Sequence, residues 1–544
     1  PLVIGERYRY TGWWQDFTYT ANALDEGEFV RFEFENLPEW LDIQENARDV
    51  VYDSVVVSGP VPEDEEDFTF IVRAIDDDRL EDTLEVYVRI FPYTLLHGQI
   101  GGVLTRDSSP YIVGDTAWVA SDDSLIFEPG VEIYCDDIIE GGRFHSVLIC
   151  SSYVRAVGTE EDSIFFKTLR GVGARRMLQV IGNRDSRSEF RFCHIAGAGG
   201  YVLGQDFTVN NCWNERGSIS GSGDGIHFDW QHNVGWGAGV IGIGVVANNR
   251  VSGIMTIGGD SVEVFNNHFD RGSLYVSQSQ GIGFGHIHHN IIDSSAGHAG
   301  IGFYVAGGGE YENLEGTVIV NSNVISNCEI GISTARYFSR LVITNNLING
   351  AYEVGLYEQE GEYNVLFTNN VIANSAIGMY FQDFELDLMD NLRTENNLFI
   401  DNEILFGIRH PGDGYESFKY NAAFGFDSLG NDDDYIGELV RVNANGDSVD
   451  AGFNLFTDPY IVNLDSLDFR LIEGSPLIDA GNPDASFFDL DSTTNDIGLY
   501  GGPLGETYDY PVGVGKSEVP VPEEFTLAPP FPNPFNLMTR LLFT

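Results

Sequence analysis

The chain has 544 residues, which is more than one ordinary domain needs and enough to bury a large core. Its formal net charge is −54, and lysine occurs only at positions 167, 419 and 516. A field of this sign repels nucleic acid and anionic membranes, so both are excluded as partners. The acidic residues indicate either a solvated exterior or specific calcium sites, because clustered carboxylates bind hard cations.

The sequence does not begin with Met, carries no signal peptide and has no apolar run of about 18 residues that could cross a bilayer. We therefore expect a processed product without a membrane span. Five cysteines are too few for a disulfide scaffold. Cys135 and Cys150 each end a short apolar run, and a one-coil separation would let them form a disulfide. Two buried thiols are the alternative.

Residues 1–92 form the first unit. Polar and apolar residues alternate in four short runs, at 17–20, 30–34, 68–72 and 84–88. Such alternation predicts strands with one buried face, and turn residues separate the runs. The pattern is typical of a small β-sandwich.

The same unit carries a family resemblance. The stretches Leu37–Ile43, Val57–Pro62 and Phe68–Val88 together resemble the cadherin-like, immunoglobulin-type domains of bacterial surface proteins. The resemblance implies a spacer or an adhesive module. An acidic turn follows the third predicted strand and is either a calcium site or a solvated turn, formed by Asp76, Asp77 and Asp78.

An Asn-Asn doublet followed by two apolar residues recurs in the middle of the chain, clearest at Asn345-Asn346, Asn369-Asn370 and Asn396-Asn397. The second Asn, counting looser copies, falls at 249, 267, 290, 323, 346, 370 and 397, so most steps are 18 to 27 residues. A period in this range predicts a solenoid whose coils bury their apolar faces by stacking. Stacked Asn side chains would satisfy amides in a buried turn, so the doublets indicate structure and not a site.

Three segments before the repeats resemble the first coils of right-handed parallel β-helix proteins of the pectate-lyase-like superfamily: Ser109–Val113, Leu125–Val131 and Gly158–Phe166. The expected fold is all-β, with a right-handed parallel β-helix over 93–430 preceded by the small sandwich. Residues 467–481 and 496–502 resemble the terminal coil of bacterial β-helix surface proteins. We therefore expect residues 431–515 to close the solenoid and cap its open end.

Residues 516–544 differ from the rest. After a Val-Pro-rich linker, Phe525–Asn536 resembles the opening of the C-terminal sorting domain of the type IX secretion system of Bacteroidota. The resemblance implies export across the outer membrane and an extracellular or cell-surface location. Such domains continue for several strands, whereas this chain stops at Thr544. The truncation leaves an apolar strand without a sheet, which contains Leu537, Leu541 and Phe543.

Enzymes of the resembled superfamily act on polysaccharides. Lyases among them abstract a proton with Lys or Arg, but lysine is missing from the central coils, and the paired Asp of polygalacturonases is also missing. The best catalytic candidates are His227, Asp229 and His232, with His268 and Arg271 about two coils later. The alternative is a set of polar side chains on an exposed face.

Further candidates are ligand sites. His286, His288 and His289 form a second histidine cluster, in which a metal site is possible because side chains two residues apart face the same way. Asp489 and Asp491 are additional candidate calcium ligands. Three tryptophans are candidates for stacking on sugars, although buried aromatic side chains are the commoner explanation: Trp213, Trp230 and Trp236.

The residue after the second Asn is apolar in the later coils, and so is the residue after that. Successive strand residues face opposite sides, so one of these columns fills the core and the other points outward. We expect the outward column to be covered, either by a chain segment or by a neighbouring subunit. It comprises Ile291, Val324, Leu347, Val371 and Leu398, and in earlier coils the same position falls on His194, Cys212, Arg250 and His268.

Two classes of function fit this sequence. The first is a non-catalytic extracellular structural protein, in which the loose terminal strand adds to a sandwich edge and builds a head-to-tail homopolymer. The second is a polysaccharide lyase or hydrolase, or a carbohydrate-binding adhesin, acting along the β-helix groove. Calcium is the one expected cofactor.

Overall fold

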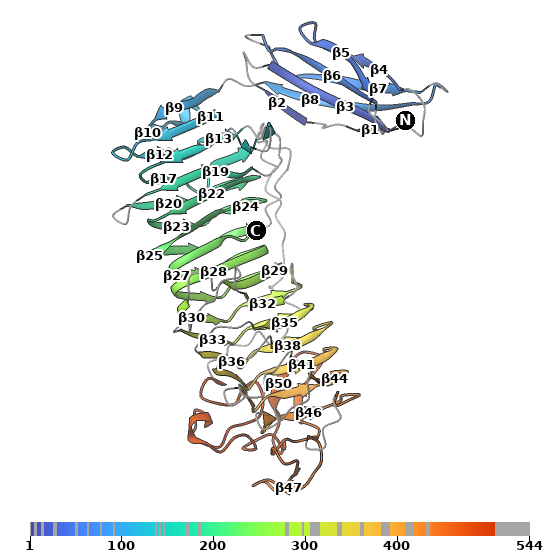
Figure 1. The fold of residues 1–544 in the computed structure, drawn as a ribbon, viewed down its shortest axis with the longest axis vertical. Helices are drawn as coiled ribbons and strands as arrows, with labels where there is room; N and C mark the ends of the chain where they lie inside the picture. Colours follow the sequence, from blue (N-terminus) through green and yellow to red (C-terminus); the bar gives the residue numbers. More distant parts are fainter. Residues whose placement is uncertain are drawn as a thin grey trace, which may run out of the picture.

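The structure is a computed structural model that describes residues 2–4, 8–11, 16–24, 30–48, 53–62, 65–76, 79–90, 93–135, 139–140, 143–144, 147–168, 174–182, 186–277, 282–295, 299–304, 316–334, 340–358, 364–381, 392–408, 418–430 and 436–505. It is all-β, as the sequence predicts, and its coils stack into a long column (Figure 1). In this part of the chain, no helix has the length and hydropathy needed to cross a membrane.

The N-terminal unit packs two four-stranded sheets, ordered β1-β3-β6-β5 and β2-β8-β7-β4. The core between them is apolar and includes Phe17, Val57, Phe70 and Val86, so the alternating runs do bury one face. The strands are β1 (Leu2–Ile4), β2 (Tyr8–Thr11), β3 (Asp16–Leu24), β4 (Arg31–Glu35), β5 (Asp42–Arg48), β6 (Asp53–Pro60), β7 (Phe68–Ile75) and β8 (Glu81–Ile90).

The solenoid follows, and 36 strands of the described chain join in its parallel hydrogen-bonded network. Each coil crosses three faces in turn, which we call faces A, B and C. Some strands turn a corner between faces: β9 (Thr94–Ile100), β11 (Tyr111–Val119), β25 (Ile219–Gln231), β27 (Gly239–Ala247), β28 (Arg250–Phe265) and β29 (His268–Ser277).

The remaining strands of the coils each belong to one face. Face A has β10 (Gly102–Leu104), β12 (Leu125–Phe127), β17 (Val154–Val157), β20 (Arg187–Arg191), β23 (Asp206–Asn210), β30 (Ile282–His288), β33 (Thr317–Asn321), β36 (Arg340–Thr344), β39 (Asn364–Thr368), β42 (Leu392–Glu395) and β45 (Phe418–Lys419). Face B has β13 (Glu132–Cys135), β18 (Ile164–Thr168), β21 (Cys193–Ala196), β24 (Trp213–Glu215), β26 (Val234–Trp236), β31 (Ile291–Asp293), β34 (Val324–Ser326), β37 (Leu347–Asn349), β40 (Val371–Ala373), β43 (Leu398–Ile400) and β46 (Ala422–Phe424). Face C has β16 (Leu148–Cys150), β19 (Ala174–Ile181), β22 (Ala198–Leu203), β32 (Ala299–Tyr304), β35 (Ile330–Ser333), β38 (Val354–Glu358), β41 (Ile377–Phe381) and β44 (Ile404–Ile408).

Short elements complete the described chain. They are the hairpin β14 (Ile139–Glu140) and β15 (Arg143–Phe144), the turns η1 (Arg106–Ser108) and η4 (Ala485–Phe487), and two C-terminal strand pairs, β47 (Arg441–Val442) with β48 (Ser448–Val449) and β49 (Ile461–Asn463) with β50 (Asp468–Leu471).

The second Asn of each doublet forms a buried ladder at the corner between faces A and B. The side-chain oxygen of Asn370, for example, accepts hydrogen bonds from both the backbone and the side-chain amide of Asn346, each at 3.0 Å. The ladder runs from Asn233 to Asn454 and ends on the buried carboxylate of Asp450. A side chain that only accepts suits the end of the ladder. The Asn454 amide needs an acceptor there, and no further residue of the ladder needs a donor.

The first Asn of the doublet has a different role. It takes a left-handed backbone conformation, with φ of 52° at Asn345 and 53° at Asn369, which Asn tolerates better than most residues. Its side chain then points away from the ladder, towards residues 477–501. Asn345 donates to the carbonyl oxygens of Leu499 and Gly501, at 2.8 and 2.9 Å.

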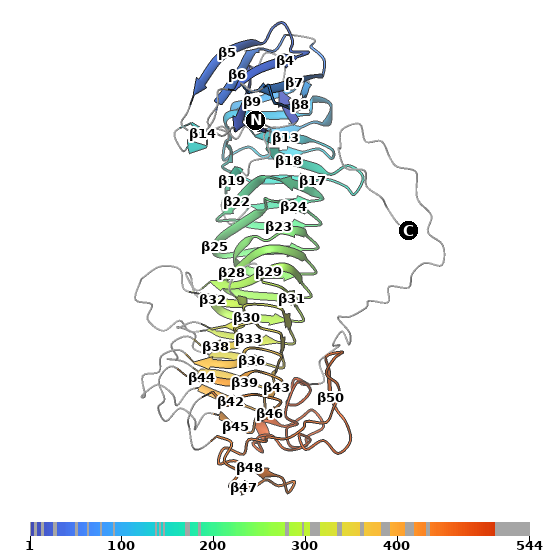
Figure 2. The same cartoon turned by 90° about the vertical axis from the view of Figure 1, so that its right-hand side faces the viewer.

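Residues 449–500 cover the outward column of face B in the later coils (Figure 2). Val324, Leu347, Val371 and Leu398 are at most 3% exposed, and they pack against Leu477, Ile497 and Leu499 among others. The sequence predicts that either a chain segment or a neighbouring subunit covers this column. In the structure a segment of the same chain covers it. The column residues proposed as an interface between subunits therefore pack within a single chain. Ile291, at the edge of the column, is partly buried.

The register corrects one residue of this column. Strand pairing aligns His194 with Trp213 and Trp213 with Val234, so Trp213 and not Cys212 takes the outward position. Cys212 is buried and takes the ladder position of its coil, where its backbone amide donates to the side-chain oxygen of Asn233. The error arose because a cysteine replaces Asn in that coil.

Of the two alternatives for Cys135 and Cys150, the structure has the buried free thiols and not the disulfide. Cys135 and Cys150 are both buried and free. Cys135 pairs in register with Val113 and Cys150 with Val119, so the two lie on different faces of one coil instead of stacking between coils. The alternative of buried thiols therefore holds for them.

Candidate functional site

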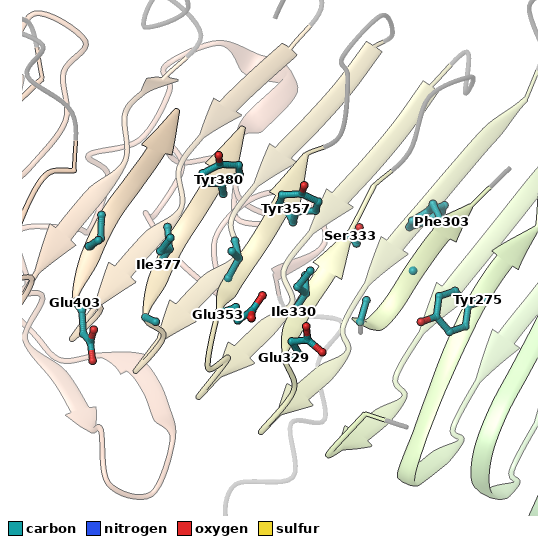
Figure 3. A pocket seen from close by; sticks show the side chains of 15 residues that line it. Tyr275, Phe303, Glu329, Ile330, Ser333, Glu353, Tyr357, Ile377, Tyr380 and Glu403 are labelled. Carbon is teal, nitrogen blue, oxygen red and sulfur yellow. The ribbon is translucent and has the colours of Figure 1, made fainter. Parts of the chain in front are cut away.

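A groove of about 780 Å³ runs along face C, over β29, β32, β35, β38, β41 and β44 (Figure 3). Its floor consists of outward side chains that repeat in register from coil to coil. Neighbouring strands of a sheet lie about 4.8 Å apart, so equivalent side chains recur at that spacing along the groove. The groove therefore suits an extended, repetitive ligand better than a compact one.

One register column supplies the tyrosine side chains of the groove. Tyr275 aligns with Gly302, then Ser333, Tyr357 and Tyr380 follow on successive coils, and the column ends at Gly407. The rings of Tyr357 and Tyr380 stack, with centroids 5.6 Å apart and an angle of 21° between planes.

The glycines in this column leave room for the tyrosine rings of the preceding coils. A Cβ at Gly302 would be 2.5 Å from a ring carbon of Tyr275, and a Cβ at Gly407 would be 2.3 Å from a ring carbon of Tyr380. Neither distance is possible for a real side chain without displacing the ring. The rings of Tyr275 and Tyr380 therefore occupy the space over the glycine of the next coil and add apolar surface to the groove.

A row of carboxylates follows the opposite edge of the groove. Figure 3 shows Glu329, Glu353 and Glu403 along this edge, facing the tyrosines across the apolar floor. Glu329 and Glu353 lie on adjacent coils, since the backbone amide of Glu353 donates to the Glu329 carbonyl at 3.0 Å. Ala376 holds the next place and Glu403 the one after. The row offers hydrogen-bond acceptors at nearly every coil.

A buried carboxyl lies directly below the aromatic column. Glu358, next to Tyr357, is 2% exposed and accepts a hydrogen bond from the Thr334 hydroxyl. Burial raises the pKa of Glu358 to about 7, and the Thr334 hydrogen bond opposes that rise only in part. Near neutral pH this side chain changes between a neutral and a charged form under the groove floor.

The predicted catalytic residues are distributed over two faces of the solenoid, with His227 and Asp229 both facing outward from face A. His227 is exposed, and its Nδ1 lies 3.5 Å from the carboxylate of Asp206. Asp229 accepts hydrogen bonds from Asn210 and Gln231, at 3.2 and 2.6 Å. His232 lies at the exposed corner before the ladder, with φ of 55°.

The other candidates lie on face B. His268 follows Arg250 in the outward column, and Arg271 is 81% exposed, with its guanidinium 3.8 Å from Asp270. Trp230 is fully buried in the core and cannot stack on a sugar, because its neighbours Asp229 and Gln231 take the outward direction. Trp213 and Trp236 are exposed on face B, at 43% and 50%.

The candidate calcium ligands serve as turn acceptors. Asp76 is buried and accepts a hydrogen bond from the backbone amide of Leu80 at 2.8 Å, while Asp77 and Asp78 lie outside the described residues. Asp489 accepts from the backbone amide of Asp496, and Asp491 from that of Thr493, each at 3.0 Å. Burial raises the pKa of Asp489 to about 6.

The comparisons with known proteins bear on the fold. The chain matches the family model described as the right handed beta helix region, over residues 252–422. That match and the large parallel sheet agree with the predicted fold. Comparison with curated proteins and with solved structures returned no match.

Sequence reasoning missed the groove, although a signal was present. Counted from the ladder Asn, a glutamate follows at six or seven residues in three coils: Asn323 to Glu329, Asn346 to Glu353 and Asn397 to Glu403. Tyr357 and Tyr380 follow their ladder Asn at 11 and 10 residues. Aligning the coils on the ladder would have displayed both rows.

Proposed function

We propose that the protein is an extracellular, non-catalytic binder of extended glycan chains, which lie along the groove of face C. The observation that carries the proposal is the pairing of a tyrosine column with a parallel row of carboxylates. Sugar rings present C–H faces that pack on flat aromatic rings, and their hydroxyl groups donate to carboxylates. The groove side chains recur from coil to coil, so they suit a polymer whose own repeating unit is short.

The charge of the site narrows the class of glycan. Three carboxylates at the groove edge and a net charge of −54 repel polyuronates and sulfated polymers. Polymers of neutral sugars, or of sugars with amino groups, are the ligands that this groove favours. This preference argues against the lyase alternative, whose substrates are acidic.

The extracellular location rests on two resemblances. Residues 525–536 resemble the opening of a type IX sorting domain, and residues 37–88 resemble the cadherin-like domains of bacterial surface proteins. Both occur in exported proteins, in which a spacer domain and a glycan-binding solenoid are a reasonable pair. Fractionation of the native cells with an antibody tests the location, and a purely intracellular signal would contradict it.

The binding test compares soluble glycans by affinity electrophoresis or calorimetry. We expect neutral or amino-sugar polymers to bind the full chain, and polyuronates to bind at least tenfold more weakly. Tyr357→Ala with Tyr380→Ala should abolish that binding. Tyr87→Ala is the matched control, since Tyr87 is equally a partly exposed strand tyrosine but belongs to the sandwich. Equal binding by both variants would refute the groove as the site.

Glycoside hydrolysis is a second candidate, favoured by the spacing of Glu329 and Glu353 on adjacent coils. Two carboxyl groups about 5 to 5.5 Å apart are typical of retaining glycosidases. Release of reducing ends from a bound glycan, lost in Glu353→Gln, would establish turnover. Binding without release would leave the non-catalytic function.

Head-to-tail assembly stays a prediction. Leu537, Leu541 and Phe543, which would form the added strand, lie outside the described residues. Removing residues 519–544 should abolish oligomers in light scattering, and unchanged oligomers would contradict the assembly.

A further inference from the structure

A second site lies on face A, away from the groove. Glu263 of β28 pairs in register with His286 of β30, and His288 lies two residues further along the same strand. One potential ligand atom from each of the three lies within 4.8 Å of the others. Among the residues that the structure describes, this is the one such group of three.

The donor set has the composition of a transition-metal site. Two imidazoles and one carboxylate converge from two neighbouring strands, and His288 Nε2 lies 3.3 Å from Glu263 Oε1. Imidazole nitrogen favours zinc and its neighbours over calcium and magnesium, which prefer oxygen ligands. Two His and one carboxylate leave one tetrahedral position open to water or a ligand oxygen.

The surroundings of His286 prepare it to bind a metal. Its Nε2 lies 2.8 Å from the side-chain oxygen of Asn321, which is 4% exposed. The amide nitrogen of Asn321 in turn donates to the Ser322 hydroxyl at 2.7 Å, which orients the amide. His286 therefore donates from Nε2 and keeps a lone pair on Nδ1. Ligating histidines ordinarily donate their second ring N–H in this way.

The neighbours of His288 fix the position of its imidazole ring. Its ring stacks on Phe265 at 5.2 Å with an angle of 9°, and on His286 at 4.1 Å. Its Nδ1 lies 2.8 Å from Nδ1 of His289, so one proton is shared between the two nitrogens. When His288 donates this proton, its Nε2 lone pair faces the Glu263 carboxylate. In the other tautomer Nε2 carries the proton and donates it to Glu263, so a metal ion bound here takes the place of that proton.

We propose that Glu263, His286 and His288 bind one Zn²⁺ ion, with Asn321 and His289 as the outer hydrogen-bond partners that orient the two imidazoles. The open fourth position accepts a water molecule or an oxygen of a bound ligand. This site is independent of the groove, because its ligands are on face A.

The test uses the full chain, stripped of metal by dialysis against a chelator. Calorimetric titration with ZnCl₂ is done in a large excess of Ca²⁺, which saturates the carboxylate sites of this acidic protein but competes poorly for imidazole. We expect one tight zinc site in the wild type. Co²⁺ in place of zinc should give the visible absorption of a tetrahedral N/O site.

Three changes locate the ion. His286→Ala with His288→Ala should remove the tight site and the Co²⁺ absorption. Glu263→Gln changes only an exposed oxygen, so the fold is kept while zinc affinity falls. Asn321→Ala should lower zinc affinity by roughly 10- to 100-fold, as loss of an outer partner does. His268→Ala is the control, since it removes an exposed imidazole from face B.

Two outcomes would overturn the proposal. One is a wild-type chain that takes up no tight zinc in the presence of Ca²⁺. The other is unchanged zinc stoichiometry and affinity in both Glu263→Gln and the double histidine variant. Circular dichroism of each variant separates loss of the site from loss of the fold.

Discussion

Asn369 and Asn495 exchange two hydrogen bonds between their side-chain amides, at 3.0 and 3.1 Å, although 126 residues separate them in the chain. Asn370, the next residue, directs its amide the other way, into the ladder. One doublet thus ties a coil to its neighbours and also to the C-terminal segment. The covering of face B depends on the first Asn, and the stacking of coils depends on the second.

Removing the Asn369 side chain should release the C-terminal segment locally. Asn369→Gly keeps the left-handed backbone but loses the hydrogen bonds to Asn495, Asp496 and Gly498. Faster hydrogen exchange over residues 477–501 and over Val371 is the expected result. Asn374→Gly is the matched control, because Asn374 has φ of 52° but its amide contacts only Asn349 at an exposed corner. Equal exchange in the two variants would argue against this role.

Removing a ladder amide should destabilise the whole solenoid. Asn346→Ala leaves the buried Asn323 amide without its acceptor and the Val320 carbonyl without its donor. Each of these two unsatisfied buried groups costs about 1–3 kcal/mol, so a loss of about 2–6 kcal/mol in the free energy of unfolding is expected. Urea unfolding measures it. Asn349→Ala, which breaks one exposed amide contact, should cost under about 1 kcal/mol.

Glu358 should make stability depend on pH. Burial raises its pKa from 4.5 to about 7, so the folded chain binds the proton more tightly than the unfolded chain. The stabilising effect of protonation is complete below pH 4.5 and is lost as pH rises through about 7, a total of about 3 kcal/mol. Comparing urea unfolding at pH 5 and pH 8 should show a larger loss in the wild type than in Glu358→Gln, in which the raised pKa of Asp489 still contributes. Glu353→Gln, at the exposed groove edge, should behave as the wild type.

Adding a methyl group under Tyr380 should weaken glycan binding. In Gly407→Ala the new Cβ would be 2.3 Å from the ring, so the ring must leave the groove floor. Loss of one stacking surface worth about 0.5–1.5 kcal/mol predicts roughly a 2- to 12-fold weaker affinity. Gly239→Ala is the control, since a Cβ there meets no atom within 4 Å. An unaffected affinity in Gly407→Ala would remove Tyr380 from the site.

The ladder shows how far the sequence could predict this fold. Doublets such as Asn345-Asn346 predicted the coils, and the covered column followed from strand alternation. Asn233, Asn421 and Asn454 were missed because His232, Tyr420 and Phe453 precede them and take the left-handed conformation that Asn usually provides. A left-handed His or Tyr costs more locally, and only the tertiary packing compensates for it.

The groove was harder to predict because it depends on register across coils of unequal length. Tyr380 follows its ladder Asn by 10 residues and Tyr357 follows its own by 11. Because the spacing is not constant, the tyrosine column does not appear as a fixed period in the sequence. The catalytic candidates stay a prediction. His227 and Asp229, two residues apart on β25, both face outward, whereas His232 lies at the corner beyond the strand.

The covering segment fixes the number of coils beneath it. The segment forms one hydrogen-bonded contact with each of three successive coils: Asn482 with Asn396, Asn495 with Asn369, and Leu499 with Asn345. Duplicating a coil between Asn345 and Asn396 would move these partners out of step unless the segment gained a matching insertion. The coils between Asn233 and Asn290 carry no such tie among the described residues. We therefore expect the earlier half of the solenoid to tolerate insertion and deletion of whole coils during evolution, and the later half not to tolerate them.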